Sequence, residues 1–320
     1  MGEFDLIRRY FTRSPGPASH AVLGVGDDCA LLAPASGMHW AISSDMLVEG
    51  RHFLSTVAPE RLGHKALAVN LSDLAACGAT PRAFMLALAL PRVDEVFLEA
   101  FARGLFALAD AQGIELVGGD TTAGPLNICI TVFGEVPTGQ ALLRSGARAG
   151  DDLYVSGTLG DARLALEVFR GALALEGSAF EQVRLAMETP QPRVGLGLAL
   201  RGVASSAIDV SDGLAGDLGH ILERSKVGAT LHLDSLPRSA VLQGLAPDLQ
   251  RRFGLAGGDD YELVFTAPAS ARADVQAAAV SAAVAVTCVG RIEAAPGLRL
   301  LDAQGQVLPN TYASFDHFKS

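Results

Sequence analysis

Aspartates that stand beside glycine, serine or threonine are the residues of this chain best suited to chemistry. Each of the following segments falls at an expected helix or strand end: Gly26-Asp27-Asp28, Ser43-Ser44-Asp45, Gly119-Asp120-Thr121-Thr122, Asp209-Val210-Ser211-Asp212-Gly213 and Gly258-Asp259-Asp260. Any one of them alone is an ordinary turn or helix cap. Carboxylate and hydroxyl oxygens are also the ligands that Mg²⁺ prefers, together with substrate phosphates. The segments together therefore predict a site for Mg²⁺ and phosphate groups.

Glycine at these positions supports the same chemistry, because backbone N–H groups without a nearby Cβ can approach phosphate oxygens. Gly213 opens a predicted helix just after Asp209 and Asp212, where the helix dipole favours an anion. The sequence therefore predicts phosphate binding near this helix start.

Asp73 is a further candidate, because it lies in an apolar predicted helix where a carboxylate must be paired or bound to metal. Pairing with Lys65 or with the backbone is the open alternative. Arg144 and Arg148 are either donors to nucleotide phosphates or solvated charges in a linker.

Composition and missing motifs exclude several other classes. The sequence has no G-x-x-x-x-G-K-[ST], no complete G-x-G-x-x-G and no H-E-x-x-H. A net charge of −10 argues against nucleic-acid binding, and no apolar stretch is long enough to cross a membrane. We therefore expect a cytoplasmic protein without a nucleic-acid or membrane partner. The four cysteines lack zinc-ligand spacing and are expected to be buried apolar residues.

The elements that must position these residues alternate between helix and strand along the chain. Helices are predicted over 3–11, 59–77, 93–111, 161–169, 180–188, 194–203 and 213–224. Strands are predicted over 40–43, 84–90, 115–117, 126–134, 153–156, 206–209, 229–233, 262–266 and 284–292. A polar, glycine-containing stretch over 137–150 reads as a junction. We therefore predict two domains of α/β or α+β class, residues 1–138 and 149–320.

The same segments, in the same order from Glu3 to Phe318, closely resemble the bacterial thiamine-monophosphate kinase family. The matching motifs include the first acidic segment, Gly50-Arg51-His52-Phe53, Arg144-Ser145-Gly146-Ala147 and Phe315-Asp316-His317-Phe318. The resemblance implies the two-domain fold shared with aminoimidazole ribonucleotide synthetase. It also implies an N-terminal mixed-sheet domain that binds ATP and pairs in a homodimer, and a C-terminal α/β domain that completes the active site.

The resemblance also implies roles for individual residues. Several Mg²⁺ ions would be held by Asp28, Ser43, Ser44, Asp45, Asp73, Asp120, Asp209 and Asp212. Contacts to ATP would come from Gly119, Asp120, Arg144 and Ser211, and contacts to thiamine monophosphate from His52, Glu262 and Phe315. Asp120, Asp212 and Arg144 would be the catalytic residues. Gln112 stands where the family would place an aromatic residue near the nucleotide.

The expected reaction is direct in-line transfer of the γ-phosphate of ATP to thiamine monophosphate, the last step of thiamine diphosphate biosynthesis. An ionised phosphate monoester is already a nucleophile, so many aspartates and no general base are expected. One alternative keeps the fold but changes the acceptor, as in selenophosphate synthetase or the hydrogenase-maturation relative. Another is a metal or nucleotide sensor that uses the same residues without turnover.

Overall fold

The computed structural model describes residues 3–13, 21–23, 25, 29–32 and 35–312. The chain forms two compact units. Unit 1 comprises residues 1–74 and 79–139, and unit 2 comprises residues 75–78 and 140–320. Among the helices of the described residues, none is both long and apolar enough to cross a membrane.

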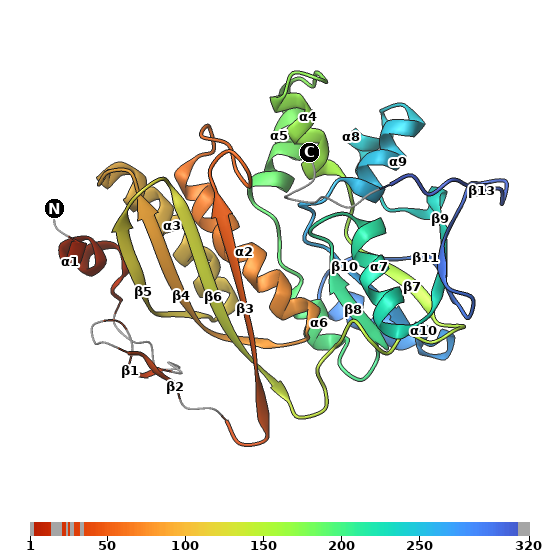
Figure 1. The fold of residues 1–320 in the computed structure, drawn as a ribbon, viewed down its shortest axis with the longest axis horizontal. Helices are drawn as coiled ribbons and strands as arrows, with labels where there is room; N and C mark the ends of the chain where they lie inside the picture. Colours follow the sequence, from red (N-terminus) through yellow and green to blue (C-terminus); the bar gives the residue numbers. More distant parts are fainter. Residues whose placement is uncertain (1–2, 14–20, 24, 26–28, 33–34, 313–320) are drawn as a thin grey trace. The chain divides into compact units, whose positions relative to one another are not determined.

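Unit 1 is built around a four-stranded sheet with the order β3-β6-β4-β5 (Figure 1). Its strands β3, β4, β5 and β6 span Met38–Val48, Thr80–Leu90, Glu115–Ala123 and Asn127–Pro137. β6 pairs antiparallel with β3 and β4, while β5 runs parallel to β4. The remaining elements are α1 (Glu3–Leu6), the π-helix η1 (Ile7–Phe11), β1 (Ala21–Leu23), β2 (Leu31–Leu32), α2 (Pro59–Ala76) and α3 (Glu95–Gln112).

The two faces of this sheet differ in burial. Helices α2 and α3 lie against one face, where Phe84, Leu86 and Leu88 of β4 are almost fully buried (Figure 1). The opposite face carries alternate residues of the same strands, because side chains of a strand point to the two faces in turn. Ile42 and Met85 remain 59% and 39% exposed there. We call these the helix face and the open face.

Unit 2 contains a seven-stranded sheet with the order β13-β12-β9-β11-β7-β10-β8. Its strands are β7 (Asp152–Ser156), β8 (Ser206–Asp209), β9 (Gly228–His232), β10 (Leu263–Ala267), β11 (Val286–Glu293), β12 (Gly297–Leu301) and β13 (Val307–Leu308). Only β9 and β12 pair in parallel. Every residue of β7, β8 and β10 is buried, as expected for strands covered on both faces.

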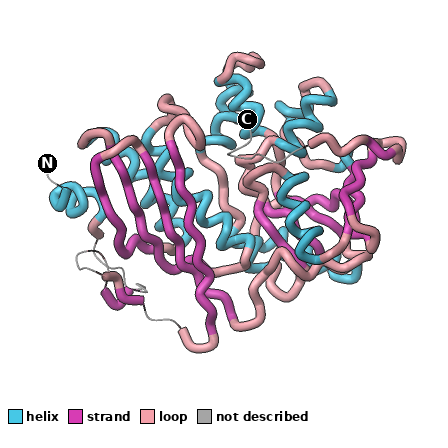
Figure 2. Tube along the Cα trace, in the orientation of Figure 1, coloured by secondary structure: helices cyan, strands magenta, loops and turns pink. Residues whose placement is uncertain are grey.

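Helices and short turns surround this sheet (Figure 2). The α-helices are α4 (Asp161–Phe169), α5 (Gly177–Glu188), α6 (Val194–Ala199), α7 (Leu214–Ser225), α8 (Ala240–Gln243), α9 (Pro247–Ala256) and α10 (Arg272–Ser281). Two 3₁₀ turns are η2 (Leu233–Ser235) and η3 (Ala269–Ala271). Buried residues of α7, including Leu214, Leu218 and Ile221, join those of β7, β9 and β10 in one core cluster.

Three sequence-based expectations are wrong. Ser44–Asp45 and Gly119–Thr122 do not form turns, because β3 and β5 continue through them. A strand paired along its length overrides the turn preference of Asp and Gly, which is the reason for both errors. The cysteines are free but not buried: Cys29 and Cys288 are exposed, and the other two are partly exposed.

Candidate active site

The helix face of unit 1 gathers one group of candidate ligands. Ser43 and Asp45 point to the same face of β3, because they are two residues apart. The Ser43 hydroxyl donates to Oδ2 of Asp73 on α2. One helical turn earlier, Asn70 Oδ1 accepts the backbone N–H of Asp45 at 3.0 Å. Two hydrogen bonds between strand β3 and helix α2 thus position three of the predicted Mg²⁺ ligands.

Ser44 and Asp120 lie on the opposite side of the same sheet. Ser44 Oγ is 2.9 Å from Thr131 Oγ1 of β6. Asp120 is the parallel partner of Ala87, which shares the open face with Met85. By strand register, therefore, unit 1 does not gather all its predicted ligands at one point. Asp120 and Ser44 belong to the open face, and Ser43, Asp45 and Asp73 to the helix face.

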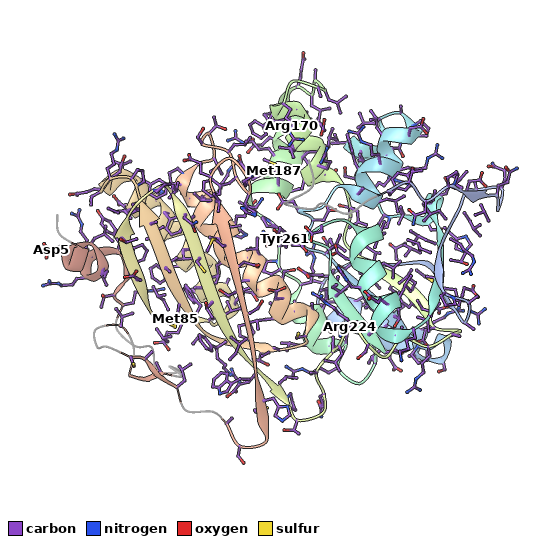
Figure 3. The ribbon with its side chains drawn as sticks, viewed as in Figure 1. Asp5, Met85, Arg170, Met187, Arg224 and Tyr261 are labelled. Atoms are coloured by element: carbon purple, nitrogen blue, oxygen red, sulfur yellow. The ribbon has the colours of Figure 1, made fainter. Side chains whose placement is uncertain are left out.

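Asp120 also lines a cavity of about 940 Å³ in unit 1. The lining is mostly apolar and includes Phe11 of η1 and Met85 of β4, which is labelled in Figure 3. Gly119 is also part of the wall, and a Cβ at this position would lie 1.8 Å from the carbonyl oxygen of Leu86. Only glycine lets β5 pass so close to β4 here. The cavity offers an apolar wall beside a carboxylate, which suits a flat ring attached to a polar group.

His52 lies in the turn after β3, where its Nδ1 accepts the backbone N–H of Val48 at 2.9 Å. This hydrogen bond leaves the ring proton of a neutral imidazole on Nε2. Two other predicted site residues, Asp28 and Phe315, lie outside the described residues.

Unit 2 presents its candidate ligands from two turns that are hydrogen-bonded to each other. The first follows Asp209, the last residue of β8, and carries Ser211 and Asp212, and the second precedes β10. Backbone N–H groups of Asp259 and Tyr261 donate to the carbonyl oxygens of Ser211 and Val210, at 2.7 and 2.9 Å. Figure 3 labels Tyr261 in this second turn. The two predicted acidic segments of unit 2 are therefore neighbours in space.

The second turn is held in an unfavourable backbone conformation. Asp259 and Tyr261 have φ angles of 64° and 51°, although neither is glycine. Such conformations cost about 1–3 kcal/mol each and persist only where surrounding contacts impose them. The hydrogen bonds to the first turn are contacts of that kind.

Two buried carboxyl groups lie beside these turns: Asp217, which no predicted segment includes, and Asp260, which belongs to the predicted segment Gly258-Asp259-Asp260. Asp217, in the first turn of α7, is 3% exposed, and its Oδ2 accepts the N–H of Asp212 at 3.1 Å. Burial raises the pKa of Asp217 to about 7, although backbone hydrogen bonds act in the opposite direction. Asp260 Oδ1 accepts the N–H of Gly160 at 2.9 Å. Burial raises the pKa of Asp260 well above its usual range.

Glu262 lies in a buried ion pair. Its Oε2 accepts from Ser156 Oγ at 2.5 Å and from Arg193 Nε at 2.7 Å, and its Oε1 accepts from Arg193 Nη2 at 2.5 Å. The Glu262 side chain is 7% exposed and that of Arg193 22%. A Cβ at Gly157 would lie 1.9 Å from Oε1, so only glycine leaves room for this carboxylate. Arg193 and Ser156 thus fix the position of Glu262, the predicted contact to thiamine monophosphate.

Arg144 lies at the far end of β8 and α7 from Asp212. Ser225, the last residue of α7, donates through Oγ to the carbonyl oxygen of Arg144 at 3.2 Å. Ser225 Oγ in turn accepts the N–H groups of Gly146 and Ala147, at 3.1 and 3.2 Å. The preceding residue, Leu143, accepts the N–H of Ala207 in β8 at 2.9 Å and so covers the edge of the sheet.

These side chains suit a hard cation and phosphate. Oxygen donors predominate, as Mg²⁺ requires. Within the described residues no three acidic, histidine or cysteine side chains come together as a complete metal cage. Mg²⁺ is commonly held by one or two carboxylates, with water and substrate phosphates as its other ligands.

Several residues that the sequence did not indicate as part of the site form hydrogen bonds with residues far away in the chain. Arg193 is 69 residues from Glu262, and Ser156 is 106 residues from it. Ser225 holds a segment 81 residues earlier. Asp217 alone gave a local signal, as an acidic residue in the first turn of a helix that follows an acidic segment.

Comparison with protein families gives matches over both units. Residues 26–136 match the N-terminal domain of AIR synthase related proteins, and residues 148–303 match the C-terminal domain. The thiamine-monophosphate kinase of Salmonella typhimurium is 45% identical over 99% of this chain and 98% of its own length. That of Haemophilus influenzae is 43% identical over 100% of this chain and 98% of its own length.

Solved structures give the same result. The crystal structure of thiamine-monophosphate kinase from Stenotrophomonas maltophilia is 46% identical, with a TM-score of 0.85 over 91% of this chain and 93% of that chain. AaThiL complexed with AMPPCP and TMP is 28% identical, with a TM-score of 0.78 over 89% of both chains.

Proposed function

The chain belongs to the thiamine-monophosphate kinase family of AIR synthase related proteins, and we propose that its acidic residues hold Mg²⁺ and ATP while the γ-phosphate of ATP is transferred to thiamine monophosphate. The protein is a thiamine-phosphate kinase, which converts ATP and thiamine monophosphate to ADP and thiamine diphosphate. Its full-length similarity to the family carries this assignment. The relative bound to an ATP analogue and TMP supports the choice of substrates.

Ligands for Mg²⁺ are proposed on both units. In unit 1 they are Ser43, Asp45 and Asp73, which β3 and α2 position through two hydrogen bonds. In unit 2 they are Asp209 and Asp212, at the end of β8 and in the turn that follows. Bound Mg²⁺ would reduce the repulsion between the phosphate anions of the two substrates. Ser44 and Asp120, on the open face, would belong to a separate Mg²⁺ site. Asp28, which lies outside the described residues, stays a prediction from the sequence.

The nucleotide is proposed to contact Gly119, Asp120, Arg144 and Ser211. The cavity beside Asp120 is apolar enough to accept a flat base. Arg144 lies at the far end of α7 from Asp212, so its guanidinium is proposed to contact the nucleotide away from the transferred phosphoryl group. Thiamine monophosphate is proposed to contact His52, Glu262 and Phe315.

The chemistry needs no covalent intermediate with the protein. A phosphate oxygen of thiamine monophosphate attacks the γ-phosphorus of ATP in line with the oxygen that leaves with ADP. One P–O bond forms as the other breaks, and the acceptor oxygen is already ionised. The proposed work of the protein is therefore to orient the substrates and exclude water, which accounts for a site with many carboxylates and no general base.

We further propose a cytoplasmic homodimer that pairs through the open face of unit 1. Ile42 and Met46 of β3 lie on this face together with Met85, and they are 59%, 54% and 39% exposed. Apolar side chains gathered on one sheet face commonly mark an interaction surface. Sedimentation equilibrium tests this proposal: Met46→Lys should give monomers, and a dimer of unchanged strength would contradict it.

The acceptor is tested by coupling ADP release to NADH oxidation with thiamine monophosphate, thiamine and other phosphate monoesters in turn. Rapid ADP release is expected with thiamine monophosphate only. If another monoester is used equally well, the acceptor assignment fails but the kinase assignment stands. If calorimetry shows ATP binding but no ADP is released with any of these acceptors, the protein is a nucleotide sensor.

A further inference from the structure

Asp217 occupies the place where a helix start would otherwise hold a phosphate. Its Oδ2 accepts the N–H of Asp212 at 3.1 Å, and the N–H groups of Ser211 and Gly213 lie close enough to the carboxyl group to lower its pKa. Backbone N–H groups at the start of a helix commonly bind an anion. In this protein the side chain of Asp217 occupies that place.

The carbonyl groups of the turn after β8 are also hydrogen-bonded. The carbonyl oxygen of Ser211 accepts the N–H of Asp259, and that of Val210 accepts the N–H of Tyr261. The N–H groups of the turn therefore face Asp217, while its carbonyl groups face the second turn. Ser211 and Asp212 themselves remain only half-buried, in contrast to Asp217, which is 3% exposed.

We propose that Asp217 is a positioning residue that fixes the Ser211–Gly213 turn, so that phosphate and Mg²⁺ are met by the side chains of Ser211 and Asp212 and not by backbone N–H groups. The inference rests on the proposed role of Asp212 as a ligand of Mg²⁺. It replaces the expectation, drawn from the sequence, that Gly213 opens a phosphate-binding helix start.

Asp161 provides a matched control in the same unit. It is 6% exposed, lies in the first turn of α4 and accepts the hydroxyl of Ser239 at 2.6 Å. Asp161→Asn and Asp217→Asn therefore both replace a buried helix-start carboxylate with an amide of the same shape. Only Asp217 contacts the proposed ligand turn.

The experiment is calorimetric titration of Mg²⁺ into the full chain saturated with AMPPCP, together with thermal unfolding of each variant. Both variants should lower the unfolding temperature. Asp217→Asn should weaken Mg²⁺ binding about tenfold or more, whereas Asp161→Asn should change it less than about twofold. In turnover assays, excess Mg²⁺ should restore much of the kcat of Asp217→Asn. Unchanged Mg²⁺ affinity in Asp217→Asn would overturn the proposal.

A wild-type measurement covers the case in which Asp217→Asn does not fold. Amide hydrogen exchange of Ser211, Asp212 and Gly213 should already be slow without nucleotide and should change little when Mg·AMPPCP binds. Fast exchange that becomes protected only with nucleotide would show that the N–H groups bind phosphate, and would overturn the proposal. Asp212→Asn distinguishes a failure of this proposal from a failure of the proposed metal site. If Asp212→Asn binds Mg²⁺ as tightly as wild type does, Asp212 is not a ligand of Mg²⁺.

Discussion

Unit 1 presents Ser43, Asp45 and Asp73 from a strand and a helix, whereas unit 2 presents Asp209 at the end of strand β8 and Asp212 from the turn that follows. In unit 1, Ser43 and Asp45 are fixed by the β3 ladder, and Asp73 by helix α2. In unit 2, Asp212 lies in a turn whose polar groups are paired with Asp217 and with the turn before β10. The first arrangement depends on regular secondary structure, and the second on a few polar contacts.

This difference predicts where substitution is costly. A ligand on a paired strand keeps its position when one hydrogen bond is lost, because the neighbouring ladder remains. A ligand on a turn has no such support. It depends on side chains and on strained residues such as Asp259 and Tyr261. We therefore expect unit 2 to be the more sensitive of the two.

The largest effect is expected for Asp212→Asn. Loss of a carboxylate that offsets phosphate charge should lower kcat about 10²–10³-fold, as for other fixed electrostatic groups. Steady-state kinetics at saturating Mg²⁺ measures this. Asp248→Asn is the control, since that side chain is 92% exposed and pairs only at the surface with Arg251. Near-normal turnover of Asp212→Asn would remove this residue from the site.

Arg193→Met should follow, because it leaves the Glu262 carboxylate buried without its cation. Breaking such a pair costs about 3–5 kcal/mol of unfolding free energy. Arg82→Met in unit 1 is the matched control, since Arg82 Nε pairs with the buried Glu135 at 2.9 Å. Both variants should lose stability in urea, but only Arg193→Met should raise KM for thiamine monophosphate. If Arg193→Met has the same KM for thiamine monophosphate as wild type, the Arg193–Glu262 pair has only a structural role.

Asp260→Asn should change how stability depends on pH. The pKa of Asp260 is raised by burial, so the folded state keeps a proton that the unfolded state releases above its ordinary value of 3.8. The contribution of Asp260 to wild-type stability should therefore fall as pH rises above 3.8, by at most about 1.4 kcal/mol per pH unit. The amide cannot ionise, so the stability of the variant relative to wild type should increase as pH rises above 3.8. Parallel stability curves in urea would show that Asp260 is ionised in the folded protein.

The smallest effect is expected for Ser43→Ala in unit 1. The substitution removes a neutral proposed Mg²⁺ ligand and its donation to Asp73, but the carboxylates of Asp45 and Asp73 and the β3 ladder remain. About 1 kcal/mol of stability should be lost. The Mg²⁺ concentration for half-maximal activity should rise less than in Asp217→Asn, and a larger rise would reverse the comparison between the units.

Sequence reasoning worked best where local pattern and tertiary structure agree. Residues 206–209 and 161–169 have the predicted type and bounds, since a short apolar run and an amphipathic period each fit one element. The pattern failed at Asp45 and Asp120, where pairing with a distant strand extends β3 and β5 through residues that favour turns. It also could not separate the two faces of the unit 1 sheet, which depend on register.

The polar contacts that position the site residues could not be predicted from the sequence, for a different reason. Arg193, Ser156 and Ser225 resemble any surface arginine or serine until the chain folds, since their partners lie 69 to 106 residues away. The proposed ligands could be named from their types and order along the chain. The groups that position them are determined by packing.

The central claim is that the γ-phosphate of ATP passes to thiamine monophosphate. ³¹P NMR of the protein with Mg·ATP and thiamine monophosphate tests it most directly. The account predicts that the thiamine monophosphate signal is replaced by two coupled signals of thiamine diphosphate, with ADP formed in equal amount. Formation of ADP and inorganic phosphate, with the thiamine monophosphate signal unchanged, would contradict it.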